Sequence, residues 1–191
     1  SARALPGLEE ELPVPVVGVV APGAREAAER SRAGRIGVIG TRGTIESGAY
    51  QDAIRERRPD AFVRGVACPL FVPLVEEGWT DDEVARLTAE RYLEPLLAEE
   101  VDALVLGCTH YPHLRRLLRE VAGKGVELVE PARATAAEAA RRLEELGLAA
   151  AGGRAPTHRY FVTDDAERFR SLAGAWMGEE IEHLEQVVVG G

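Results

Sequence analysis

The sequence predicts an α/β protein whose strands are mainly parallel and are covered by helices on both faces. Short runs rich in Val and Ile alternate along the chain with longer amphipathic stretches, which is the order that parallel α/β folds show. The chain has 191 residues, 46% of them hydrophobic and 29% charged, so it can bury a sizeable core. Only 5% are aromatic, so we expect that core to consist mainly of Val, Leu, Ile and Ala.

Seven runs are predicted as strands, because they are rich in apolar and β-branched residues. In chain order they are residues 14–20, 35–41, 62–68, 102–107, 126–129, 159–163 and 185–189. The run 102–107 is apolar after its first residue, which is typical of a strand buried on both faces.

Helices are predicted between these runs from amphipathic spacing and end signals. They cover residues 24–31, 50–57, 80 to 99 or 100, 112–121, 135–146 and 165–174. Thr80 and Glu83 match the capping box, and Pro95 predicts a kink in the helix they open. Pro112 suits a first helical turn, where its missing N–H is not needed.

The charge balance argues against a nucleic-acid partner. Lys and Arg number 23 against 32 acidic residues, a net charge of −9, and the arginines alternate with glutamates rather than forming a basic stripe. A small anionic substrate stays open, because hydroxyls and backbone N–H groups can hold a carboxylate.

The sequence contains no clear signal for a membrane or for secretion. The longest apolar stretch, residues 12–21, is too short to cross a bilayer and contains two prolines, and the chain begins without a secretory leader. Two cysteines are too few for a disulfide framework and fit a reducing compartment. We therefore expect no membrane partner and a cytoplasmic location.

Two of the predicted strand ends, where parallel α/β folds place their sites, carry weaker signals. Thr41 and Thr44 lie in a glycine-containing turn and could donate to a carboxylate, although the motif read alone favours a tight turn with an N-cap threonine. Cys68 follows the strand at 62–68 and is expected to pack as a small hydrophobe, and Glu76 in isolation would be solvated.

The third strand end, at Cys108, is the most informative. Cys108 follows the apolar strand just before a predicted helix, whose N-terminus would favour the thiolate. A thiol with a pKa near 8.5 is only about 3% ionised at pH 7, so such a shift would matter. His110 could stabilise the thiolate or share its proton. A buried cysteine with Thr109 as N-cap and an exposed His110 stays open.

A zinc site is the other chemistry that these residue types allow. Cys108, His110 and His113 are three potential ligands within six residues, but their spacing fits neither paired ligands nor the i, i+4 helical pattern. His158 and His183 lie alone in the sequence, so no second ligand pair exists and we expect no metal.

These motifs resemble those of the glutamate racemases in the aspartate/glutamate racemase superfamily. The similarity runs over nearly the whole chain, in segments 13–19 (PVPVVGV), 37–50 (GVIGTRGTIESGAY), 68–76 (CPLFVPLVE) and 106–112 (LGCTHYP). The last segment is the most specific, because aspartate racemases typically carry Glu where this chain has His110.

The resemblance implies cofactor-independent interconversion of L- and D-glutamate by two cysteines, supplying D-glutamate for peptidoglycan. One cysteine removes the α-proton on one face while the other returns a proton on the opposite face. By resemblance Cys108 is one acid/base, with His110 and Glu76 as supporting acid groups and Thr109, His110, Thr41 and Thr44 near the substrate carboxylates. Glutamate is then the small-molecule partner, and a homodimer is compatible with the resemblance.

The resemblance also implies two similar parallel-sheet domains, the first of them incomplete here. Residues 21–130 would form the C-terminal racemase domain that carries Cys108, and 1–20 with 131–191 a remnant of the other. The family's Asp-Ser-Gly and Cys-Asn-Thr-Ala-Ser motifs are absent, and Ser1-Ala2 matches the end of the second. We therefore expect a sequence that starts after the first catalytic cysteine, and a remnant that exposes apolar surface.

We expect the chain to be inactive alone, because the first catalytic cysteine is missing and Cys68, on another strand of the same domain as Cys108, is not expected to face it across a substrate. Two alternatives remain open at this point. The chain could be a non-catalytic fragment that binds an acidic amino acid or a protein partner, or it could belong with the aspartate racemases.

Overall fold

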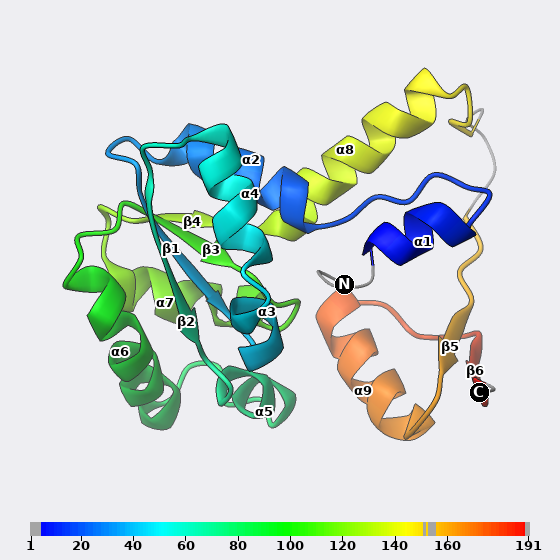
Figure 1. Cartoon of the computed structure of the whole chain (residues 1–191). Helices are drawn as coiled ribbons and strands as arrows, with labels where there is room; N and C mark the ends of the chain where they lie inside the picture. Colours follow the sequence, from blue (N-terminus) through cyan, green and yellow to red (C-terminus); the bar gives the residue numbers. More distant parts are fainter. Residues whose placement is uncertain (1–4, 151, 153–155, 190–191) are drawn as a thin grey trace. The chain divides into compact units, whose positions relative to one another are not determined.

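The computed structural model describes residues 5–150, 152 and 156–189, and the chain divides into two compact units, Ser1–Ala149 and Ala150–Gly191 (Figure 1). The resemblance places domain boundaries at 20/21 and 130/131 instead, and that division stays a prediction. No helix within the described ranges is both long and apolar enough to span a bilayer.

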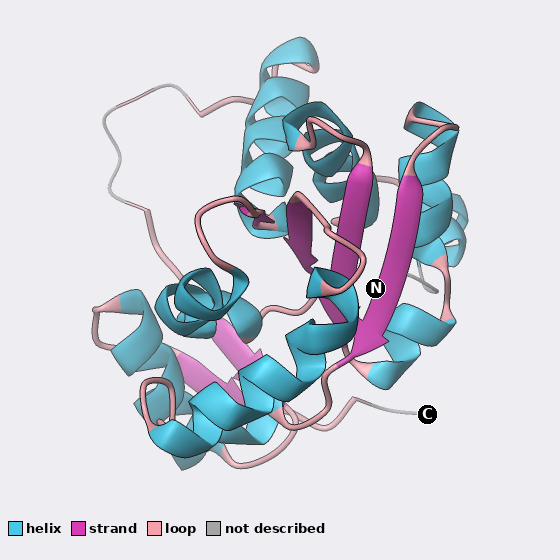
Figure 2. Ribbon diagram, turned by 90° about the vertical axis from the view of Figure 1, so that its left-hand side faces the viewer, coloured by secondary structure: helices cyan, strands magenta, loops and turns pink. Residues whose placement is uncertain are grey.

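The larger unit is built on a parallel four-stranded sheet in the order β2-β1-β3-β4 (Figure 2). Its strands are β1 (Arg35–Gly40), β2 (Phe62–Ala67), β3 (Ala103–Leu106) and β4 (Glu127–Val129). Ile39 of β1 pairs with Val66 on one side and Leu106 on the other, so the carboxyl ends of β1, β2 and β3 lie next to one another. The predicted parallel α/β fold is confirmed.

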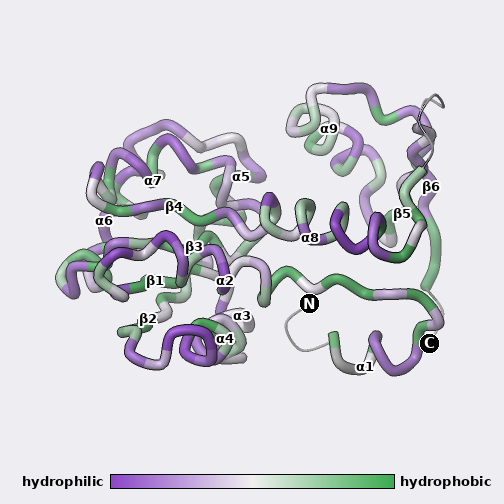
Figure 3. The backbone as a smooth tube through the Cα atoms, turned by 90° about the horizontal axis from the view of Figure 1, so that it is seen from above, coloured by the Kyte–Doolittle hydropathy of each residue, from purple (hydrophilic) through white to green (hydrophobic). Residues whose placement is uncertain are grey.

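Helices cover both faces of this sheet, as the burial of β1, β3 and β4 requires. Residues of α2 (Val20–Arg30) and α4 (Ala49–Arg57) pack on one face, against the side chains of Ile36 and Val38. Residues of α5 (Phe71–Glu76), α6 (Glu83–Leu97) and α7 (Arg115–Ala122) pack on the other, against Ile39 and Leu104. The hydrophobic colour of β1, β3 and β4 in Figure 3 follows from burial on both sides.

Three further helices belong to the larger unit. They are α1 (Leu5–Glu11), α3 (Arg42–Glu46) and α8 (Pro131–Glu145). The smaller unit is a single β-α-β element, in which β5 (Tyr160–Val162) and β6 (Leu184–Gln186) pair in parallel and α9 (Ala166–Met177) connects them.

Large apolar side chains are exposed in the segments that the resemblance assigns to the remnant. They are Leu8, Leu12, Val14, Leu143, Leu146, Leu148, Phe161, Trp176, Met177, Val188 and Val189.

The strand predicted at residues 14–20 is wrong. Residues 15–18 have no regular structure, and α2 already begins at Val20, four residues before the predicted helix. Pro13 and Pro15 cannot donate to a sheet, and no described strand lies beside this segment to accept it.

The helix ends also differ in three places. Asp82, not Thr80, caps α6 by accepting the N–H of Ala85 at 2.9 Å, so the capping-box prediction is wrong. Pro112 lies in a 3₁₀ turn, Tyr111–Leu114, that precedes α7. Helix α8 begins at Pro131, four residues before the prediction, because proline is favourable at a first helical position.

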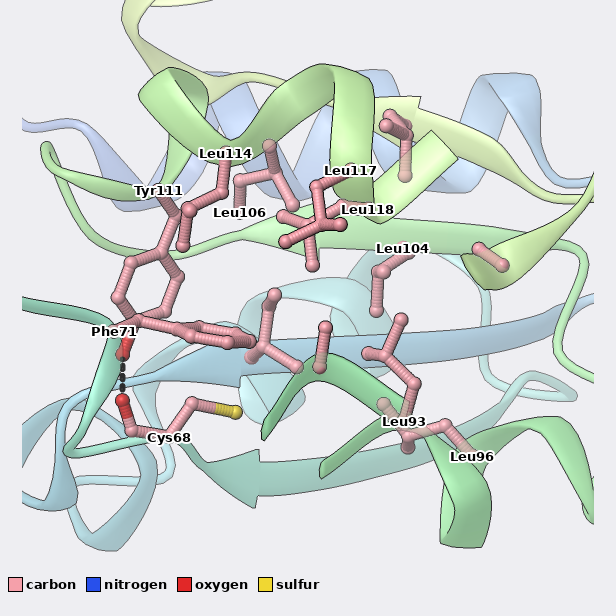
Figure 4. Close-up of a cluster of buried hydrophobic side chains, with 14 of the residues drawn as sticks. Cys68, Phe71, Leu93, Leu96, Leu104, Leu106, Tyr111, Leu114, Leu117 and Leu118 are labelled. Carbon is pink, nitrogen blue, oxygen red and sulfur yellow. Dashed lines mark hydrogen bonds between the residues drawn. The ribbon is translucent and has the colours of Figure 1, made fainter. Parts of the chain in front are cut away.

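Tyr111 ties two of the strand ends together inside the larger core cluster (Figure 4). Its hydroxyl donates to the Cys68 carbonyl at 2.8 Å, and its ring meets the Phe71 ring edge to face at 5.2 Å. The loop that carries Cys108 is thereby fixed against the end of β2.

Candidate active site

A cavity of about 280 Å³ opens at the carboxyl ends of β1 and β3, where the parallel fold predicts a site. Its lining consists mainly of small and apolar residues together with hydroxyl groups and one thiol. The lining residues are Val19, Thr41, Thr44, Tyr50, Leu106, Gly107, Cys108, Thr109, Pro112, Pro131 and Ala132. No lysine or arginine is among them, so a bound anion would depend on hydroxyl and backbone donors.

Thr41 and Thr44 supply two of these hydroxyls from the turn after β1. Thr41 is the N-cap of α3, and its Oγ1 accepts the N–H of Thr44 at 3.3 Å. The two Oγ1 atoms lie 3.0 Å apart and share a hydrogen bond. The structure therefore contains the N-cap turn that the sequence allowed and places both hydroxyls at the cavity.

Cys108 begins a chain of polar contacts that leads away from the cavity. Its Sγ lies 3.9 Å from Nδ1 of His110, and the Nε2 atom of His110 lies 3.1 Å from Oε1 of Glu76, the last residue of α5. A carboxylate beside Nε2 favours the tautomer with its proton there, which leaves Nδ1 as an acceptor facing the thiol. The structure thus brings together three residues from two separate segments of the chain, the end of α5 and the loop after β3.

The sequence predicts that the surroundings of Cys108 favour its thiolate form, and the structure corrects this prediction. Burial raises the pKa of Cys108 above the ordinary thiol value, and the N–H groups of His110, Tyr111 and Thr109, with the Thr109 hydroxyl, oppose that rise only in part. Helix α7 begins only at Arg115, so its N-terminus is not at the thiol as the sequence suggested. In this state the thiol form is favoured.

Cys68 has the surroundings of a core residue, as expected. Its side chain is 0% exposed, and its Sγ points into the apolar cluster and contacts the Val66 carbonyl at 3.6 Å (Figure 4). Burial raises the pKa of Cys68 to about 12.

Gly107 and Tyr50 also line the cavity, and neither was predicted from the sequence. A Cβ at Gly107 would lie 2.8 Å from the Ile39 carbonyl oxygen and 3.3 Å from Cε2 of Tyr50, so only glycine lets the chain pass here. The glycine between an apolar strand and a cysteine was a usable signal for this close approach. Tyr50, at the start of α4, carried no signal in the sequence.

A metal site is not formed by the described part of the chain, where no group of three His, Cys, Asp or Glu side chains is arranged to hold an ion. Cys108 and His110 face each other directly.

Cys108 is expected to react with iodoacetamide well before Cys68 in the folded chain. The rate at Cys108 should rise with pH toward a midpoint above that of an ordinary thiol, because burial raises the pKa of Cys108 and the thiolate is the nucleophile. Mass mapping of the alkylated peptides across a pH series measures both sites, with urea-unfolded chain as the control in which they react alike. Equal labelling in the folded chain would contradict this assignment.

Known proteins match both the sequence and the fold. The family model described as Asp/Glu/Hydantoin racemase matches residues 1–139. The glutamate racemase of Geobacter metallireducens is 49% identical over 187 residues, covering 98% of this chain and 69% of that protein.

Solved structures agree with this result. A glutamate racemase from Bacillus anthracis superposes with a TM-score of 0.92 at 37% identity, covering 98% of this chain and 70% of that one. The glutamate racemase of Francisella tularensis, solved with D-glutamate, superposes at 0.89 with 31% identity, covering 98% and 69%. The chain therefore belongs to the glutamate racemases of the Asp/Glu/hydantoin racemase family.

Proposed function

We propose that Cys108 is an acid/base group for the α-proton of glutamate, with His110 and Glu76 controlling its proton. The observation that carries this proposal is the contact chain from the cavity thiol through the imidazole to a carboxylate. A base must be deprotonated, and His110 Nδ1 is positioned to accept the thiol proton while Glu76 stabilises the imidazolium that forms.

Racemisation also needs a second group that returns a proton to the opposite face of the α-carbon. The Cys108 thiolate removes the α-proton and becomes a thiol, and a second group returns a proton to the opposite face of the resulting carbanion. The family resemblance implies a second cysteine for that step and no cofactor. Thr41, Thr44 and Thr109 are proposed to donate to the substrate carboxylates, with backbone N–H groups beside them.

A second candidate is a chain that binds an acidic amino acid without turning it over. The complete burial of Cys68 favours it, because Cys108 is then the only accessible thiol of the two in the sequence. We propose that the complete glutamate racemase acts in the cytoplasm and supplies D-glutamate for peptidoglycan. A homodimer stays a prediction.

Glutamate is expected to protect Cys108 from iodoacetamide, because a ligand in the cavity covers its thiol. We expect protection by L- or D-glutamate at lower concentration than by aspartate, and little protection by norvaline, which lacks the side-chain carboxylate. The measurement is the rate of Cys108 alkylation against ligand concentration, with Cys68 in urea-unfolded chain as the control for reagent quenching. Protection by aspartate in preference to glutamate would favour the aspartate racemase alternative, and none by either would contradict the proposal.

A further inference from the structure

Tyr50 is the hydroxyl of the cavity that the proposed proton transfer leaves unused. It lies in the first turn of α4 and is only 3% exposed, yet it lines the same cavity as Cys108. A Cβ built at Gly107, the residue before Cys108, would lie 3.3 Å from the Cε2 atom of Tyr50, so the end of the ring lies beside the loop that carries the thiol.

The ring of Tyr50 is held on both sides by backbone. A Cβ at Gly107 would lie 3.3 Å from its Cε2, and a Cβ at Gly23 would lie 3.2 Å from its Cε1. Two glycines therefore enclose the end of the ring, between the loop of Cys108 and the first turns of α2. This close packing around the ring fixes the position of the Tyr50 hydroxyl, whereas the hydroxyl of a surface tyrosine can move.

Each of the other cavity hydroxyls has a hydrogen-bond partner within the protein, although only one hydroxyl of the Thr41–Thr44 pair can donate to the other. Thr41 and Thr44 bond to each other, and Thr109 Oγ1 lies 3.4 Å from His110 Nδ1. No group in the described part of the chain makes a hydrogen bond to the Tyr50 hydroxyl. The Tyr50 ring is buried, but its hydroxyl oxygen is not among the fully buried polar atoms that lack a partner, so it is accessible from the cavity. A buried tyrosine usually bonds its hydroxyl to a partner, and a ligand in the cavity could be that partner.

We propose that Tyr50 contacts the substrate and that its hydroxyl donates a hydrogen bond to a carboxylate of the bound amino acid. This inference rests on the proposed function, since it takes the cavity at Cys108 as the place where glutamate binds. The phenol suits that task because burial, with a further contribution from Cys108, raises the pKa of Tyr50 to about 12. It therefore stays protonated near neutral pH and is available as a hydrogen-bond donor.

Two matched substitutions separate this role from a structural one. Tyr50→Phe and Tyr111→Phe each remove one oxygen from a buried ring, but the Tyr111 hydroxyl is bonded to the Cys68 carbonyl. We expect Tyr50→Phe to raise the glutamate concentration for half-protection of Cys108 about tenfold, as for one lost hydrogen bond to a charged group, with an unchanged melting temperature. Tyr111→Phe should lower the melting temperature, because it removes the hydrogen bond to the Cys68 carbonyl, and should raise the half-protection concentration less than Tyr50→Phe does.

Ligands that lack one carboxylate complete the test. The effect of Tyr50→Phe should disappear either with norvaline, which lacks the side-chain carboxylate, or with 4-aminobutyrate, which lacks the α-carboxylate. An effect that persists with both would overturn the proposal, as would a Tyr50→Phe chain that melts as early as Tyr111→Phe. If Tyr50→Phe leaves the half-protection concentration unchanged, the role of Tyr50 is overturned but the proposed function is not. If glutamate does not protect Cys108 in the unsubstituted chain, both are overturned.

Discussion

Replacing Cys108 by serine is expected to abolish exchange of the α-proton of glutamate, whereas Cys68→Ser should keep most of it. A serine hydroxyl is a far weaker acid than a thiol, so it cannot form the base at working pH, and loss of one general base typically costs about 10²- to 10⁴-fold. Cys68 lies fully inside the core, where a serine hydroxyl can donate to the Val66 carbonyl that the thiol now contacts.

Proton NMR of D- and of L-glutamate in D₂O, each incubated with the 191-residue chain, measures this exchange. We expect slow loss of the α-proton signal for one enantiomer only, because Cys108 faces one side of the α-carbon. Equal loss of exchange in Cys68→Ser, with the fold intact by circular dichroism, would show that the two thiols have been assigned to the wrong roles.

The 191-residue chain is also expected not to racemise glutamate. Of its two thiols, only Cys108 reaches the cavity, and a single base that removes and returns a proton on one face restores the same enantiomer. Inversion requires a second group on the opposite face, held in position at the same time.

Circular dichroism of L-glutamate mixed with the purified chain follows the second prediction directly. A constant signal over a period in which NMR shows exchange would separate proton transfer from inversion. Steady decay of the signal, absent in Cys108→Ala, would mean that another residue of this chain supplies the second proton.

Local patterns were sufficient for most of the fold. The strands predicted at 35–41, 62–68, 102–107 and 126–129 begin and end within one residue of their predicted bounds. Three of them are mostly buried, and runs buried on both faces carry a clear apolar signal. The run 14–20 carries the same apolar signal but is not a strand. A strand must pair with a neighbouring strand, and the β-propensity of a run does not tell whether such a neighbour exists.

The site was predictable only as far as residue type and strand ends allow. Cys108, His110 and the two threonines follow strands, so their common location could be inferred from the parallel order. The partnership of Glu76 with His110 came from the family resemblance, because 34 residues separate them and Glu77 offered the same carboxylate. The direction of the Cys108 pKa shift could not be inferred, since burial and the orientation of N–H groups depend on tertiary packing.

The parallel sheet has a consequence for how the chain must be handled during synthesis and refolding. Its strands pair only across intervening helices, and such non-local pairing is slow to form. Until β1, β2 and β3 have paired, both cysteines are exposed with ordinary thiol pKa values and are open to oxidation. Folding itself then protects them, by enclosing Cys68 and by raising the pKa of Cys108. The molecule is most vulnerable to oxidative damage before it is native, so a reducing agent matters more during refolding than during storage.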